Sequence, residues 1–399
     1  MSQEKKKFNL SKLKDISSMD VKDIGKIFKK NNSESNNIRY KDINNKESKI
    51  KGRGRQVISI DIGSYSIKVV EGKFQKNILN INKLIEVETP EGIVADGKIL
   101  DENYLVATLD KLIKENNIKA KDVIFTTNSS SIINRDILIP SVAEEELDTV
   151  VRYEIQQYLP INLNDYVIQY IFLEEVSEDD EIKLKINVTA FPERMALSYY
   201  NVINSLSLNP YILDVNYNSI NKLANLGEFT LNEQYIIEGT VAFVDMGATS
   251  INVSIFKNGK VDFTRIIRIG GDNIDHALSE SMNMSIKSTE LIKMKEVDLL
   301  DNDKGNLKTK TIQRVVDEAL EELERIIQFY KNKSNSSIDK LYVFGGLSSI
   351  KNIDIYLGEK LNIKASKIEE IKNINLGNND LFTKDLSIYL NAIGAIIRV

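Results

Sequence analysis

The chain has 399 residues and a formal net charge of -5, and hydrophobic residues make up 42% of it. This length exceeds what a single hydrophobic core usually spans, so two or more lobes are expected. The absence of Cys excludes disulfides and thiolate metal sites, and the single histidine, His276, excludes His-rich metal sites and the usual catalytic triads.

Residues 1–55 form a basic tail. They hold 16 Lys or Arg and 7 Asp or Glu, a net charge of +9, so the rest of the chain carries -14. The segment 31–51 is rich in Asn, Ser and Lys, and so few apolar side chains cannot offset the entropy of ordering. We therefore expect a disordered extension. Weak helical periodicity over residues 8–28 leaves a second interpretation open, a basic arm that contacts anionic lipid or a partner.

The start of the chain does not have the pattern of a secretory signal. The basic run Lys5-Lys6-Lys7 is followed by Phe8-Asn9-Leu10 and not by a long apolar segment. Apolar runs elsewhere, such as residues 393–397, fall far short of the roughly 20 residues that span a bilayer. A cytoplasmic location is expected.

Folded character begins at Val57. The apolar run from Val57 is broken by Asp61 and closed by Gly63, which predicts a buried strand entering a tight turn. A second apolar run at residues 67–70 completes a β-hairpin.

Two helices are predicted farther along. Ser141 and Glu144 form a capping box at the start of a helix that ends at Pro160. Apolar residues at helical spacing predict a long helix over residues 311–332. Since strands and helices mix throughout, the fold class is α/β.

An internal repeat carries the strongest chemical signal. Residues 60–69, IDIGSYSIKV, align without gaps on residues 244–253, VDMGATSINV. Small side chains in each turn let backbone N–H groups approach phosphate oxygens, whereas the Asp in each copy would repel phosphate unless a cation lay between them. A single hairpin of this type is more often an ordinary turn, and the duplication is what favours a site for phosphate and Mg²⁺.

A third segment strengthens this interpretation. Residues 341–344 predict a buried strand that runs into Gly345-Gly346 and then Leu347. A glycine pair at such a turn lets a ribose or a flat ring lie close to the backbone. A plain turn is the alternative.

These three segments occur in the order of the phosphate-1, phosphate-2 and adenosine motifs of the superfamily of actin, heat-shock chaperones and sugar kinases, which the chain resembles. The resemblance implies that ATP and Mg²⁺ bind between two lobes. Asp61 and Asp245 would hold Mg²⁺ mainly through water. Glu290 and Lys293 are similar to helix residues that reach the ribose hydroxyls, with an ordinary exposed helix as the alternative. The other implied nucleotide contacts are Gly63, Ser64, Tyr65, Ser66, Lys68, Gly247, Ala248, Thr249, Gly345, Gly346 and Leu347.

A more specific resemblance lies outside these motifs. Ile139-Pro140 leads to VRYEIQQYLP at residues 151–160, which is similar to the segment A-I-R-W-E-A-E-Q-Y-I-P of the PilM family of type IV pilus assembly, with Tyr153 in place of Trp. The resemblance covers residues 57–399 and implies a cytoplasmic ATP-binding scaffold.

The same resemblance implies the partner. The family binds the cytoplasmic N-terminus of a PilN-like inner-membrane protein, and we expect that peptide in a groove between the first lobe and an inserted subdomain. Membrane association would be peripheral, through this partner, at the inner face of the cytoplasmic membrane. Pilus assembly ATPases are further candidate partners, and nucleic acid is not expected.

The resemblance also implies a fold, the actin-like ATPase fold with duplicated sheet domains in two lobes and an inserted small α+β subdomain of FtsA/PilM type. The division expected along the chain is a tail over 1–55, lobe I over 57–84, 186–235 and 381–399, the inserted subdomain over 85–185, and lobe II over 238–380.

Slow or absent ATP hydrolysis is expected. Val215 lies where related ATPases carry the hydrolytic carboxylate, and Asp214 is the nearest candidate catalytic residue. Two other functions stay open, a small-molecule kinase of the sugar or acetate type and an FtsA-like cell-division protein. The second needs a C-terminal amphipathic helix, which is not expected because the sequence ends at Val399.

Overall fold

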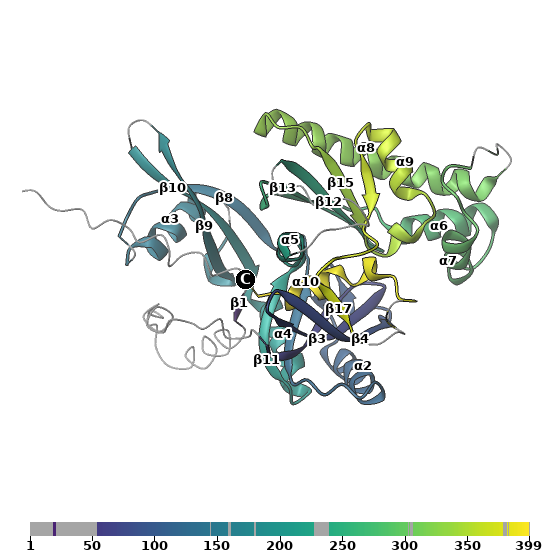
Figure 1. The fold of residues 1–399 in the computed structure, drawn as a ribbon, viewed down its shortest axis with the longest axis horizontal. Helices are drawn as coiled ribbons and strands as arrows, with labels where there is room; N and C mark the ends of the chain where they lie inside the picture. Colours follow the sequence, from purple (N-terminus) through teal and green to yellow (C-terminus); the bar gives the residue numbers. More distant parts are fainter. Residues whose placement is uncertain are drawn as a thin grey trace, which may run out of the picture.

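The computed structural model describes residues 19–20, 54–143, 145–158, 161–178, 181–226, 239–301, 303, 306–377, 381 and 383–398. Most of the basic tail lies outside these residues, as do Glu144 and Pro160 of the predicted helix. Figure 1 shows two large lobes, with a smaller subdomain projecting from one of them.

Lobe I is built on a seven-stranded sheet with the order β1-β11-β7-β2-β3-β4-β17. Its strands are β1 (Met19–Asp20), β2 (Gln56–Ile62), β3 (Ser66–Gln75), β4 (Ile78–Glu88), β7 (Asp122–Thr127), β11 (Asn209–Val215) and β17 (Ile374–Leu376). The predicted hairpin is confirmed, since β2 pairs antiparallel with β3 and β7 lies parallel to β2 on its other side.

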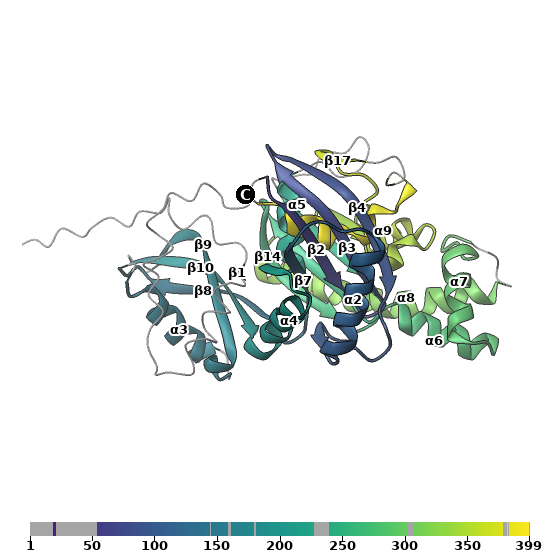
Figure 2. The same cartoon turned by 90° about the horizontal axis from the view of Figure 1, so that it is seen from below.

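Helices cover both faces of this sheet, which explains why β2 is an almost continuous apolar run. Two of them, α2 (Glu102–Glu115) and α4 (Glu193–Ser205), pack on one face with residues such as Ile60 (Figure 2). The other two, α5 (Asn216–Leu226) and α10 (Leu390–Ile396), share a core with Val70 and also with Phe243 of lobe II. These two helices therefore join the lobes. A short hairpin of β5 (Val94–Ala95) and β6 (Lys98–Ile99) follows β4.

The inserted subdomain is a three-stranded antiparallel sheet, β8-β10-β9, with one helix on it. Its elements are β8 (Ile133–Pro140), α3 (Leu147–Tyr158), a 3₁₀ turn at Leu163–Asp165, β9 (Tyr166–Glu178) and β10 (Glu181–Pro192). The buried face of α3, with Leu147, Val151 and Ile155, packs on alternate residues of the strands.

Lobe II contains a five-stranded sheet with the order β14-β13-β12-β15-β16. Its strands are β12 (Thr240–Met246), β13 (Ile251–Lys257), β14 (Lys260–Ile267), β15 (Lys340–Phe344) and β16 (Ala365–Lys367), and its helices are α6 (Gly271–Met282), α7 (Ile286–Lys295), α8 (Leu307–Ser334) and α9 (Ile353–Leu361). Short 3₁₀ turns lie at Gly346–Ser349 and Leu386–Ile388. The predicted long helix is confirmed as α8, whose apolar stripe faces the lobe II core.

The sheet order corrects three of the expected boundaries. Strand β7 and helix α2 belong to lobe I, so the inserted sheet begins only at β8 and continues through Pro192. Strand β17 pairs with β4 of lobe I, although it lies in the range expected for lobe II. Each boundary follows from strand pairing between residues far apart in sequence, which local patterns do not encode.

Candidate nucleotide site

The two copies of the sequence repeat fold into the same structure. In each, a strand ends in a tight turn that the following strand closes. The amide of Gly63 donates to the carbonyl of Ser66 at 3.2 Å, and the amide of Gly247 donates to the carbonyl of Ser250 at 3.0 Å. We call these segments the first turn, residues 63–66, and the second turn, residues 247–250.

The tips of the two turns meet across the lobes. Ser64 Oγ lies 3.2 Å from Thr249 Oγ1, although the two residues are 185 positions apart. The Tyr65 hydroxyl, also on the first turn, donates to the carboxylate of Glu290 on α7. The structure therefore brings together predicted site residues from both lobes.

Beneath the turns, two carboxylates share one amide. Asn391 Nδ2, on α10, donates to Asp245 Oδ2 at 3.0 Å and lies 3.5 Å from Asp61 Oδ2. Burial raises the pKa of the Asp61 carboxyl to about 6, with Lys68 opposing the rise and Asp245 adding to it. Burial also raises the pKa of Asp245. A divalent cation between the carboxylates would relieve both their burial and their repulsion.

The surroundings fit a hydrated Mg²⁺. Asn391 Oδ1 is buried and has no hydrogen-bond partner, so it is placed to accept from a metal-bound water. Within the described residues there is no cluster of three or more acidic or His side chains able to hold a metal ion. Two carboxylates alone leave most of the octahedral Mg²⁺ shell to water and phosphate oxygens, which is usual for this ion.

Lys68 lies beside the first turn. It is paired with Asp61 across the β2–β3 ladder, and its Nζ donates to the carbonyl of Ser66 at 3.3 Å. The ammonium group therefore lies beside the first turn, and contact of Lys68 with a phosphate stays a prediction.

Helix α6 contributes a part of the site that sequence reasoning missed. Its first amides bond to the second turn, Gly271 N to the carbonyl of Gly247 at 3.1 Å and Asp272 N to that of Ala248 at 2.9 Å. A Cβ on Gly270 would lie 2.3 Å from the Ala248 carbonyl oxygen. The sequence does contain a signal for this contact, the glycine pair Gly270-Gly271 directly before apolar residues at helical spacing.

The predicted Gly-Gly segment converges on the same place. Gly345 has φ +88°, and a Cβ there would lie 2.5 Å from Asp245 Oδ1. Leu347 packs against the position of Gly271. The third segment therefore abuts the end of β12, directly before the second turn, and the start of α6.

Glu290 and Lys293 project from α7 toward this region. Lys293 Nζ forms a buried ion pair with Asp275 Oδ2 of α6 at 2.6 Å, and it lies 3.3 Å from where a Gly271 Cβ would be. Lys293 therefore ties α7 to α6 next to the glycines. Ribose contact by Glu290 and Lys293 stays a prediction.

Asp214 is engaged in other contacts. Its carboxylate forms a buried ion pair with Lys222 and accepts from Asn218 Nδ2 at 2.7 Å. Burial lowers the pKa of Lys222 to about 8, with Asp214 opposing the fall. A catalytic role for Asp214 stays a prediction, and it would require the loss of these contacts.

The sequence of the folded part decides the family. A family model described as type IV pilus assembly protein PilM matches residues 59–399. The chain belongs to this family. Among the described residues, no helix combines the length and the apolar character needed to cross a membrane.

Solved structures with a similar fold include one described as the PilM-PilN type IV pilus biogenesis complex. It is 19% identical, the match covers 85% of this chain and 97% of the other, and the TM-score is 0.72. An ethanolamine utilization protein EutJ from Carboxydothermus hydrogenoformans is 14% identical, with 86% and 89% covered and a TM-score of 0.48. MreB 5 of Spiroplasma citri bound to AMPPNP is 13% identical, with 85% and 94% covered and a TM-score of 0.47. The predicted actin-like ATPase fold is confirmed.

Proposed function

We propose that this PilM-family protein is a cytoplasmic ATP-binding scaffold of the type IV pilus assembly machinery. The observation that supports nucleotide binding best is the meeting of the two turns above Asp61, Asp245 and Asn391. Backbone amides, one lysine and a pair of carboxylates then lie within one small region. This combination suits a polyphosphate with its divalent cation.

In this proposal each element has a distinct task. The amides of the two turns cradle phosphate oxygens, and Lys68 neutralises part of their charge. Asp61 and Asp245 orient water around Mg²⁺, whose chemistry is to neutralise the charge on the phosphates. The nucleoside would lie near Gly346, where a Cβ would meet nothing within 4 Å, and near Glu290 and Lys293.

Hydrolysis is slow or absent in this proposal. A general base must lie within hydrogen-bond reach of the attacking water. Val215 cannot serve, and the Asp214 carboxylate is held by Lys222 and Asn218. The bound nucleotide would act mainly by holding the lobes together.

The partner we propose is the cytoplasmic N-terminus of a PilN-like inner-membrane protein, which recruits the scaffold to the membrane. Family membership supports this, and the similar structure described as a PilM-PilN complex agrees with it. The inserted sheet offers two edge strands, β8 and β9, and an edge strand can pair with an extended peptide. A groove between lobe I and this sheet is the proposed seat.

Thermal unfolding of the purified chain tests nucleotide binding. A ligand that binds only the folded state stabilises it by mass action, by about 2.7 kcal/mol at a concentration 100 times its Kd. Millimolar ATP with Mg²⁺ should raise the melting temperature, and the same concentration of ATP with EDTA should raise it less. An unchanged melting temperature would remove ATP from the proposal, and phosphorylation of a sugar or of acetate would replace the scaffold with a kinase.

A further inference from the structure

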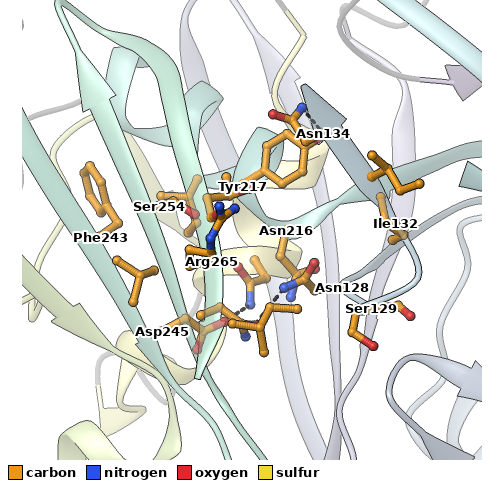
Figure 3. A pocket seen from close by; sticks show the side chains of 18 of the residues that line it. Asn128, Ser129, Ile132, Asn134, Asn216, Tyr217, Phe243, Asp245, Ser254 and Arg265 are labelled. Atoms are coloured by element: carbon orange, nitrogen blue, oxygen red, sulfur yellow. Dashed lines mark hydrogen bonds between the residues drawn. The ribbon is translucent and has the colours of Figure 1, made fainter. Parts of the chain in front are cut away.

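A cavity adjoins the candidate nucleotide site and shares Asp245 and Asn391 with it. It measures about 280 Å³ and lies between the start of the inserted sheet, helix α5 and the edge strand β14. Figure 3 shows Arg265 reaching from β14 into this space, near Tyr217 of α5, with Asp245 at another side. The cavity therefore has walls from both lobes and is separate from the two turns.

Two arginines line this cavity, Arg135 from β8 and Arg265 from β14. In the described part of the chain, no carboxylate lies within ion-pair distance of either guanidinium. Partial burial and repulsion from Arg135 lower the pKa of Arg265. Two like charges that face one space repel each other, and an anion between them would turn this repulsion into attraction.

Two carboxylates next in sequence to Arg135 and Phe263 are already engaged. Asp136 accepts from Asn187 Nδ2 at 2.7 Å and lies 3.7 Å from Lys185 Nζ. Asp262 accepts from the Tyr330 hydroxyl at 2.7 Å. Neither of these two carboxylates forms an ion pair with Arg135 or Arg265 among the described residues.

Arg265 is held in position but keeps free donors. One of its nitrogens, Nη1, donates to the carbonyl of Thr264 at 3.0 Å, and the guanidinium stacks over the Phe263 ring at 4.4 Å from its centroid. A guanidinium has five N–H groups in a planar fork. The others can face a ligand in the cavity.

We propose that this cavity binds a small oxyanion of the phosphate class between Arg135 and Arg265. Arginine forks match phosphate oxygens in geometry and charge. The volume of about 280 Å³ leaves room for a small ion together with several waters. Asp245 lies on another wall of the cavity, hydrogen-bonded to Asn391. Its negative charge repels an anion, so the anion binds at the arginine end. Because Arg135 belongs to the inserted subdomain and Arg265 to lobe II, the bound anion bridges these two parts.

Titration of the full chain with inorganic phosphate tests this site. Melting temperature and calorimetry are measured at constant ionic strength, with NaCl as the balancing salt and no nucleotide. The starting variant for these measurements is Lys68→Ala, in which we expect phosphate binding at the first turn to be weakened. We expect phosphate to stabilise Lys68→Ala. Adding either Arg135→Ala or Arg265→Ala to this variant should weaken its affinity for phosphate about tenfold or more. Arg325→Ala, an exposed arginine on α8, is the matched control and should leave affinity unchanged.

Three results would overturn the proposal. In the first, phosphate stabilises the double variant Arg135→Ala/Arg265→Ala as strongly as it stabilises the starting variant. In the second, Lys68→Ala alone abolishes the response, which would place the ion at the first turn. In the third, acetate stabilises the chain as well as phosphate does, which would make the cavity a carboxylate site. Circular dichroism shows whether each variant is folded. If an alanine variant does not fold, Arg265→Lys, which keeps the charge, is measured in its place.

Discussion

The first and second turns share a sequence pattern and a hydrogen bond but differ in what surrounds them. Asp61 faces Lys68 across the β2–β3 ladder, whereas Asp245 faces Asn252 across the β12–β13 ladder at the matching position. Asn252 accepts a hydrogen bond from Asn128 at 2.7 Å. At this ladder position the first turn thus has a cation, whereas the second turn has an uncharged amide.

The second turn is instead enclosed by backbone. The start of α6 bonds to it, and Gly345 approaches Asp245 from the other side. We infer that the two halves of the duplication contribute differently to the proposed phosphate site, with a charged side chain in lobe I and closely packed glycines in lobe II. The predictions below test this division of tasks.

The largest effect is expected at the glycines of lobe II. Gly345→Ala puts a Cβ 2.5 Å from Asp245 Oδ1 and keeps a φ of +88° that only glycine adopts easily. Strain and overpacking together should lower the free energy of unfolding by about 3 kcal/mol. Urea denaturation measures this.

The neighbouring glycine is a matched control. A Cβ on Gly346 meets nothing within 4 Å, so Gly346→Ala should change stability by less than about 0.5 kcal/mol. Equal losses in the two variants would mean that the close approach to Asp245 is unimportant.

A smaller effect is expected from the pH dependence of Asp61. Its folded pKa of about 6 lies above the ordinary 3.8, so the folded state binds more protons than the unfolded state between these values. Stability contributed by this group therefore falls as pH rises from about 4 to about 6. The free energy of unfolding of the metal-free wild type should therefore fall by on the order of 2 kcal/mol over this interval, relative to that of Asp61→Asn.

Urea denaturation at a series of pH values, in EDTA, gives this difference. Adding Mg²⁺ and ATP should reduce it, because the cation favours the ionised carboxylate. A wild type that instead gains stability over Asp61→Asn as pH rises would show that Lys68 and Asn391 already compensate the charge.

A third prediction concerns the affinity for ATP-Mg²⁺ when Lys68 or Asn252, which occupy matching positions in the two ladders, is replaced. Lys68→Ala should weaken ATP-Mg²⁺ binding about tenfold or more, because it removes the cation beside the first turn. Asn252→Ala should change the affinity less than threefold. Isothermal titration calorimetry resolves the two outcomes, and similar losses in both variants would contradict the division of tasks between the lobes.

The sequence was most informative where function constrains a local pattern. The repeat predicted both turns and the carboxylates Asp61 and Asp245, and the third segment predicted Gly345, which packs beside Asp245. It did not reveal Asn391, because nothing in the α10 segment shows that its amide ends between two carboxylates from different lobes. The contact between Tyr65 and Glu290 was missed for the same reason, since it depends on how the lobes close.

The smallest effect is expected at this contact. Tyr65→Phe removes one hydrogen bond between largely exposed groups, so stability should change by less than about 1 kcal/mol. Because the bond joins the tip of the first turn to α7, its loss should let the lobes open more often. Release of a fluorescent ATP analogue should become several-fold faster by stopped-flow, while the association rate changes little. Tyr104→Phe, an exposed tyrosine on α2, provides the control. If both variants release the analogue at the wild-type rate, the side-chain bridge between the lobes does not hold the nucleotide, and closure depends on the phosphates and the cation alone.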